Sequence, residues 1–109
     1  MASRRGKYGA RRTEVDGITF ASAMESRRYG ELRLAEMAGE IRDLELQPRY
    51  PLRVNGQLIC TYVADFRYLD VRTGRIVVED VKGKPTPVYR LKAKLMRAVH
   101  NISVLETTA

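Results

Sequence analysis

The sequence predicts a single mixed α/β (α+β) domain in which helices flank a small antiparallel sheet. Helical patterns with capping signals occur near both ends of the chain, and apolar side chains alternate with a period of two between them. Asn55-Gly56 and Thr73-Gly74 are turn signals that divide this middle region into strands. The predicted order is therefore α-β-β-β-α-β, a three-stranded antiparallel meander plus a final strand. A length of 109 residues suits one domain of this kind.

The first helix is expected to begin at Ser22 and to stop at Gly39. "SAMESRRYGELRLAEMAG" offers Ser22 as N-cap, Glu25 three residues later and helix-forming residues after it. The apolar stripe of this helix is imperfect and consists of Met24, Leu32 and Ala35. The three strands follow at about residues 43–54, 57–69 and 75–82.

The second helix, "VYRLKAKLMRAVH", follows Thr86 as N-cap and Pro87 at the first helical position, and Asn101 can end it. Its aliphatic residues predict a buried face made of Val88, Leu91, Leu95 and Val99. Its other side carries a basic stripe made of Arg90, Lys94 and Arg97. The segment "ISVLE" then predicts the last strand.

Composition excludes several classes of site. Cys60 is the only cysteine, so the chain has no internal disulfide and no multi-cysteine zinc site. His100 is the only histidine, which excludes a histidine-rich metal cage. No apolar run approaches the roughly 20 residues of a membrane span, and no signal peptide precedes the basic start. We therefore expect a cytoplasmic protein that does not associate with membranes.

Positive charge is concentrated at the start of the chain. The sequence has 20 Lys and Arg against 13 Asp and Glu, a net charge of +7. Residues 1–14 are expected to form a flexible basic arm, and residues 15–109 the domain. The basic side chains of the arm are Arg4, Arg5, Lys7, Arg11 and Arg12. Such an arm is typical of proteins that neutralise nucleic-acid phosphates, although a solubilising tail would have the same composition.

Two aspartates are predicted to face each other across the second hairpin. If the turn is centred between Arg72 and Thr73, Asp65 lies directly opposite Asp80, and Lys82 shares the face of Asp80. Opposed like charges are destabilising, so this pair would raise a pKa or hold a cation between its carboxylates. The alternative is an exposed cross-strand charge cluster, since the acid-x-base triplet occurs six times in the chain.

These residues resemble a known nuclease signature. "YVADF" and "EDVKG", with fourteen residues between the two aspartates, resemble the motif of the PD-(D/E)XK nuclease superfamily. The predicted element order is similar to the restriction-endonuclease-like core of that superfamily. "FASAMESRRYGELRLAEMAGEIRDLELQP" also resembles the start of a small phage and prophage family of endonuclease-like proteins of unassigned function. Two departures are Ala64 at the usual proline and Asp80 at the more frequent glutamate.

The resemblance implies a metal centre for Mg²⁺ or Mn²⁺. Asp65 and Asp80 would be ligands, with the backbone carbonyl of Val81 as a third. Lys82 would orient the attacking water or stabilise the charge that develops on the phosphate.

Two further residues match the family pattern. Glu25, on the first helix, would complete the metal shell, although a capping box with Ser22 explains the same glutamate without a metal. Gln47 would lie near the metal or the DNA, or would satisfy a backbone group at a strand edge.

By this resemblance the protein would be a metal-dependent DNA endonuclease of a phage or prophage, acting in the cytoplasm of the bacterial host. It would prefer branched, flapped or junction DNA, and a role in resolving Holliday junctions would require a homodimer. Phage or host replication and recombination proteins are further expected partners. DNA-binding residues besides the arm would be Lys84, Arg90, Lys94 and Arg97. The alternatives are a non-catalytic nucleic-acid-binding protein and a factor that modulates another protein.

Overall fold

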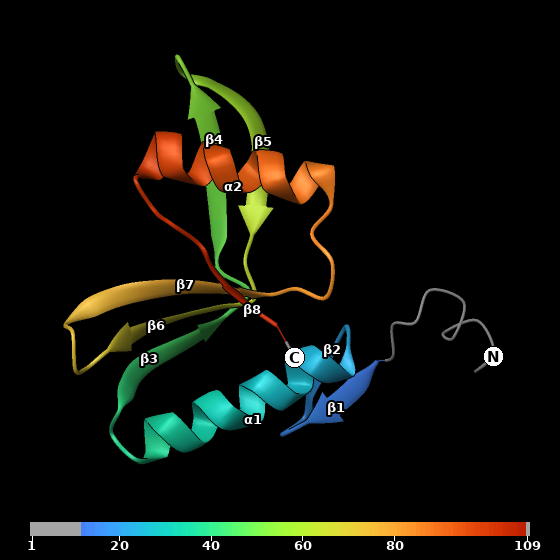
Figure 1. The fold of residues 1–109 in the computed structure, drawn as a ribbon, viewed down its shortest axis with the longest axis vertical. Coiled ribbons are helices and arrows are strands. Elements are labelled where there is room, and N and C mark those ends of the chain that lie inside the picture. The colour runs from blue at the N-terminus through green and yellow to red at the C-terminus, as the bar shows by residue number, and fades with distance from the viewer. Residues whose placement is uncertain (1–11, 109) are drawn as a thin grey trace.

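A four-stranded sheet forms the centre of the protein (Figure 1). The computed structural model describes residues 12–108. The sheet has the order β3 (Ile41–Leu46), β6 (Phe66–Asp70), β7 (Arg75–Val81) and β8 (Leu105–Thr107). The first three strands are antiparallel, and β8 runs parallel to β7. This arrangement confirms the predicted mixed α+β class, with an antiparallel meander and a final strand.

The two helices lie on opposite sides of this sheet. α1 (Ala23–Met37) runs below β3, and α2 (Pro87–His100) crosses in front of the separate hairpin β4–β5 (Figure 1). Each helix covers its own apolar cluster, which contains Phe66 on the α1 side and Val78 on the α2 side. Within residues 12–108, no helix is long and apolar enough to cross a membrane.

The predicted caps of both helices are present. The hydroxyl of Ser22 accepts a hydrogen bond from the N–H of Glu25 at 3.1 Å. The hydroxyl of Thr86 accepts one from the N–H of Tyr89, also at 3.1 Å. Asn101 ends α2 in the left-handed conformation, with φ of 56°.

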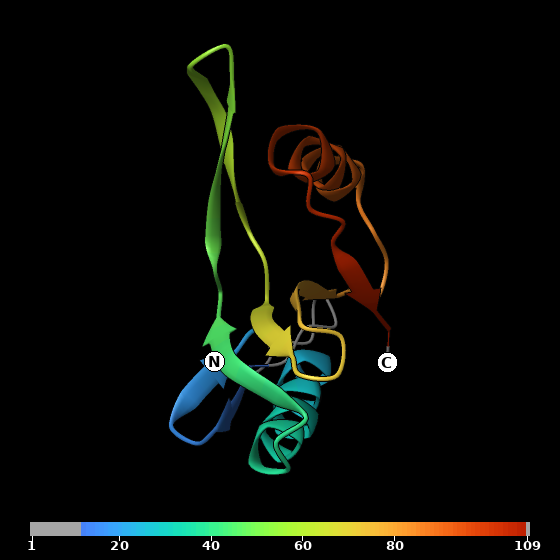
Figure 2. The ribbon, with the colours of Figure 1, turned by 90° about the vertical axis from the view of Figure 1, so that its left-hand side faces the viewer.

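A long bent hairpin replaces the first two predicted strands. β3 and β6 form its base within the sheet, and β4 (Arg49–Val54) and β5 (Gln57–Val63) form an arm that projects beyond α2 (Figure 2). The bend falls at Gln47, which has φ of 53°, and at Ala64, whose N–H donates to the carbonyl of Pro48 at 3.1 Å. The prediction of unbroken strands was wrong here because alternation continues through the bend and does not reveal it.

The register of the second hairpin is the predicted one. Phe66 pairs with Glu79, and Asp70 pairs with Arg75 at the turn. In every pair, the two residues are equally far along the chain from the point between Arg72 and Thr73, as a turn centred there requires. Asp65 lies one residue before β6, beyond the last regular pair, and its side chain reaches that of Asp80.

Three short strands differ from expectation. β1 (Thr13–Val15) and β2 (Ile18–Phe20) form a hairpin that the sequence analysis did not predict, and β1 starts before the expected domain boundary at residue 15. This hairpin packs against α1. β8 begins at Leu105 and not at Ile102.

The predicted buried face of α2 was wrong. Val88 and Leu91 are 63% and 60% exposed, whereas Tyr89 is 6% and Met96 is 0% exposed. Ala93, on the same side as Tyr89 and Met96, packs against the cluster beneath the helix. Compared with the prediction, the helix is therefore rotated about its axis. Tyr89 and Met96 face the hairpin, and Val88 and Leu91 lie beside this contact.

Truncating Met96 tests this orientation. Met96→Ala is expected to lower the free energy of unfolding by about 2 kcal/mol, because it leaves a cavity in the cluster that joins α2 to the hairpin. Val88→Ala, on the exposed stripe, is the matched control and should change it by less than about 0.5 kcal/mol. Urea denaturation measures both values. Equal losses would contradict the observed orientation.

Candidate metal centre

Asp65 and Asp80 meet where β6 and β7 come together at one end of the sheet. The carboxylate Oδ2 of Asp65 accepts a hydrogen bond from the N–H of Val81 at 2.7 Å. The N–H of Asp65 donates to the carbonyl of Glu79 at 3.2 Å, one residue out of the β6–β7 register, so the regular ladder ends at Phe66. Asp80 is 3% exposed. The backbone of β7 therefore holds the carboxylate of Asp65 next to Asp80.

Proximity and burial perturb the acids of this site. Burial, followed by hydrogen bonding with Asp80, raises the pKa of Asp65 to about 8. Burial and the charge of Asp80 likewise raise the pKa of Glu25. The raised pKa of Asp65 favours its protonated form at neutral pH, and a divalent cation can take the place of that proton.

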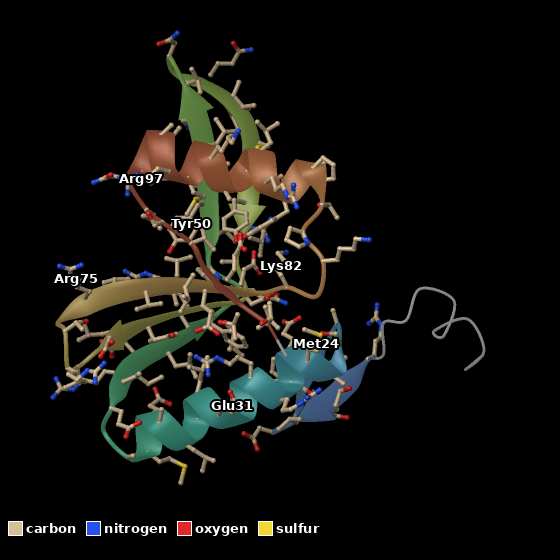
Figure 3. All side chains as sticks on the ribbon, in the orientation of Figure 1. Met24, Glu31, Tyr50, Arg75, Lys82 and Arg97 are labelled. Carbon is tan, nitrogen blue, oxygen red and sulfur yellow. The ribbon has the colours of Figure 1, made fainter. Side chains whose placement is uncertain are left out.

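Lys82 supplies positive charge beside the pair. Its Nζ lies 3.5 Å from Oδ2 of Asp80 and 4.1 Å from the centroid of the Tyr89 ring. Figure 3 shows Lys82 between α2 and the sheet. The hydroxyl of Tyr62 donates a hydrogen bond to the same oxygen of Asp80. Tyr62 and Lys82 together fix the orientation of the Asp80 carboxylate.

Glu25 approaches the pair from the first turn of α1. Its backbone N–H donates to the hydroxyl of Ser22 and so completes the cap. Among residues 12–108, the carboxylate of Glu25 does not accept the return hydrogen bond from the N–H of Ser22 that a full capping box would have. Glu25 is 7% exposed, and its carboxylate interacts electrostatically with Asp80 and Lys82. The capping box is therefore half formed, and the carboxylate faces the candidate centre.

The donor atoms fit a hard cation such as Mg²⁺ or Mn²⁺. Among residues 12–108, no three His, Cys, Asp or Glu side chains converge closely enough to hold a metal by themselves. Mg²⁺ is commonly bound by one or two carboxylates, several waters and phosphate oxygens. Asp65 and Asp80 can serve as those carboxylates. The N–H of Val81 points towards Asp65. Because the N–H and the carbonyl of one strand residue point to the same side, the carbonyl of Val81 also points towards Asp65.

Gln47 contacts this region through its backbone. Its N–H donates to the carbonyl of Asp65 at 2.9 Å, and its side chain is exposed. Gln47 therefore helps to form the bend that positions Asp65. A role for its side chain near the metal or the DNA stays a prediction.

A buried network behind the centre was not predicted. Glu79, which points away from Asp80 as expected, is 0% exposed. Its carboxylate accepts hydrogen bonds from Nε and Nη2 of Arg28 at 2.5 and 3.1 Å. The hydroxyls of Tyr68 and Thr107 also donate to it, at 2.6 and 2.8 Å. Glu79 thereby joins α1, β6 and β8 to β7. In the sequence, the only signal for this second acidic site was that Glu79 stands next to Asp80.

Comparison with protein families gives one match. A family model described as "Protein of unknown function (DUF1064)" matches residues 5–106. The chain belongs to the DUF1064 family. The match covers every residue of the candidate centre of this DUF1064 protein. No curated protein and no solved structure matches the chain.

The predicted DNA-binding residues of this DUF1064 protein divide into two groups. Arg4, Arg5, Lys7 and Arg11 lie outside the described residues. The other five are exposed, and they are Arg12, Lys84, Arg90, Lys94 and Arg97. The last three follow one flank of α2, where Nη1 of Arg97 donates to the hydroxyl of Ser103 at 2.9 Å. This flank therefore faces the C-terminal segment that leads to β8.

Proposed function

We propose that this DUF1064 protein is a Mg²⁺- or Mn²⁺-dependent DNA endonuclease that hydrolyses phosphodiester bonds. The observation that supports this most strongly is the opposed pair Asp65–Asp80, with Lys82 on the same face of β7. A core built for stability alone would not place two acids together, because each destabilises the charged form of the other. The resemblance of "YVADF" and "EDVKG" to the PD-(D/E)XK motif supports the same function.

The residues of the centre have different roles in hydrolysis. Asp65 and Asp80 hold the cation, with Glu25 facing the same place from α1. When bound, the cation supplies Lewis-acid polarisation of the phosphodiester. Lys82 places an ammonium where negative charge develops as water adds to phosphorus and the P–O bond breaks. Tyr62 keeps Asp80 in position, and the products are a phosphate end and a hydroxyl end.

Basic residues around the centre provide the attraction that DNA requires. Without them, the acids of the centre would repel phosphates. The exposed flank of α2 and Lys84 would hold the backbone of the substrate. In a domain of this size we infer recognition of DNA structure, such as branches, flaps or junctions, in phage DNA recombination or repair. Cutting a junction on both sides would require a homodimer.

Cleavage assays test this proposal. We expect cutting of labelled linear, single-stranded, flapped or four-way DNA with Mg²⁺ or Mn²⁺ and none with EDTA. Asp80→Asn and Lys82→Ala should each lower the rate about 100-fold or more, because each removes a charge that acts on the reacting phosphate. Gel electrophoresis of the labelled products measures the rates and identifies the preferred substrate.

Asp70→Asn is the matched control. Like Asp80, Asp70 stands near a strand end two residues before a basic side chain. Among the described residues, its carboxylate accepts one hydrogen bond, from the N–H of Arg72. This variant should cut at the parental rate. Absence of cutting with either metal, together with DNA binding that Asp80→Asn retains, would contradict the proposal and would indicate a non-catalytic nucleic-acid-binding protein.

A further inference from the structure

The flank of α2 that faces away from Arg97 carries an apolar stripe. Val88, Leu91, Leu95 and Val99 follow one another at intervals of three and four residues, the spacing of one helix face. Val88 is 63%, Leu91 60% and Val99 36% exposed. Leu95 lies at the base of this stripe and packs against the cluster beneath the helix.

The hairpin that α2 contacts carries a further exposed apolar side chain. β4–β5 extends past α2 and leaves its tip uncovered (Figure 2). Val54 lies on the same face of β4 as the fully buried Leu52, two residues nearer the tip, and is 42% exposed. The inner face that α2 covers at Leu52 is therefore open at Val54. We call the apolar residues of the stripe and of the adjoining hairpin the α2 notch, consisting of Val54, Val88, Leu91, Leu95 and Val99.

Charge around the α2 notch has one sign. The two elements that form it, α2 and the hairpin 49–63, contain no Asp or Glu. They contain six basic side chains, which are Arg49, Arg53, Arg90, Lys92, Lys94 and Arg97. Of these, Arg90 and Arg97 lie on the opposite flank of the helix, and Nζ of Lys92 also donates to the carbonyl of Thr61 at 3.4 Å. Lys92 and Lys94 flank the stripe on its two sides. A second copy of this chain would bring like charges together, whereas a partner with acidic residues beside apolar ones would match both features.

We propose that the α2 notch binds an acidic amphipathic helix of a partner protein. The partner's apolar side chains would cover Val88 and Leu91, and its carboxylates would meet Lys92 and Lys94. An α-helix is the fitting shape because the apolar stripe runs for about three helical turns, a length that a helix lying alongside can cover. Nucleic acid would satisfy the charges but would leave the aliphatic side chains exposed. This inference does not depend on the nuclease proposal.

Peptide binding tests the inference with the full chain. The probe is a fluorescein-labelled synthetic helix with leucines at heptad spacing and glutamates at the flanking positions. One control peptide has lysines for the glutamates, and another has serines for the leucines. Fluorescence anisotropy should show binding of the glutamate–leucine peptide alone, weakened by added salt. Val88→Ser/Leu91→Ser should weaken that binding about 10-fold or more.

Leu34→Ser is the matched control variant, because Leu34 is a 67% exposed leucine on the other helix. It should bind the peptide as the parent does. Absence of binding at about 1 mM peptide, or equal binding of the lysine peptide, would overturn the inference. A dimer in sedimentation velocity that Val88→Ser/Leu91→Ser dissociates would assign the notch to a second copy. Loss of single-stranded DNA binding in that variant would assign it to nucleic acid.

Discussion

Asp65→Asn is expected to make the metal-free protein more stable than the parent at alkaline pH. The asparagine keeps the shape of the side chain and an oxygen that can accept the hydrogen bond from Val81. It removes the charge that burial and Asp80 oppose. Each unit of pKa shift corresponds to about 1.4 kcal/mol. Solvent near the half-buried Asp65 screens part of this, so we expect a gain of about 2 kcal/mol above pH 8.

The pH dependence of this gain follows from the direction of the pKa shift. The pKa of Asp65 is 3.8 ordinarily and about 8 in the folded protein. Between these values the folded chain holds a proton that the unfolded chain has lost, so stability falls as pH rises. The free energy of unfolding of Asp65→Asn should exceed that of the parent by almost nothing at pH 4. This excess should grow up to pH 8 and stay constant above it. Urea denaturation across this range measures it.

Metal ions should reverse the order of stability. Mg²⁺ or Mn²⁺ is expected to bind the folded parent, to neutralise the pair and to raise its melting temperature, more strongly as pH rises towards 8. Asp65→Asn lacks one ligand and should gain little. Asp70→Asn again serves as control and should respond to metal as the parent does. A parent that neither metal stabilises, or an Asp65→Asn variant less stable than the parent at pH 9, would contradict a metal site at this pair.

The sequence was sufficient to predict the pairing of the two acids because local signals determine it. Turn chemistry around Thr73-Gly74 sets the register of β6 and β7, and strand alternation then sets which side chains share a face. Helix caps are similarly local, and Ser22 and Thr86 cap as predicted. The turn at Asp16-Gly17 is an equally local hairpin signal that would have predicted β1–β2.

Features that depend on distant contacts could not be predicted in this way. The aliphatic stripe of α2 has the stronger apolar pattern, but Tyr89 and Met96 are buried because they fit against the hairpin. Whether Glu25 serves as a cap or faces the acids depends on how α1 sits on the sheet. That position depends on the pairing of Arg28 with Glu79, residues that are 51 positions apart.

Arg28→Ala is expected to lower the free energy of unfolding by about 3–5 kcal/mol, because it leaves the fully buried Glu79 without a compensating charge. Burial alone would raise the pKa of Glu79, but hydrogen bonds from Arg28, Tyr68 and Thr107 lower it below its ordinary value of 4.5. This network therefore stabilises the fold above about pH 4.5, and its contribution is lost as pH falls through the lowered pKa. The effect of Arg28→Ala should shrink accordingly in acid.

Arg33→Ala is the matched control on the same helix. Arg33 also pairs with a carboxylate at 2.5 Å, that of Glu36, but this pair is on the surface, so its loss should change stability far less than the loss of Arg28. Adding Glu79→Gln to Arg28→Ala removes the uncompensated charge and should restore about half of the loss. Urea denaturation of the parent and these three variants measures these differences. Equal effects of Arg28→Ala and Arg33→Ala would contradict the network.

The same network should affect metal binding, because Glu25 lies one helical turn before Arg28 and Asp80 follows Glu79 in β7. Arg28→Lys keeps the charge but loses the two-pronged contact that fixes the position of α1 on the sheet. If Glu25 takes part in the centre, Arg28→Lys should weaken the stabilisation by Mn²⁺ as Glu25→Gln does, and the two changes together should weaken it no further. Additive losses in this double-mutant comparison would show that Arg28 acts on folding alone.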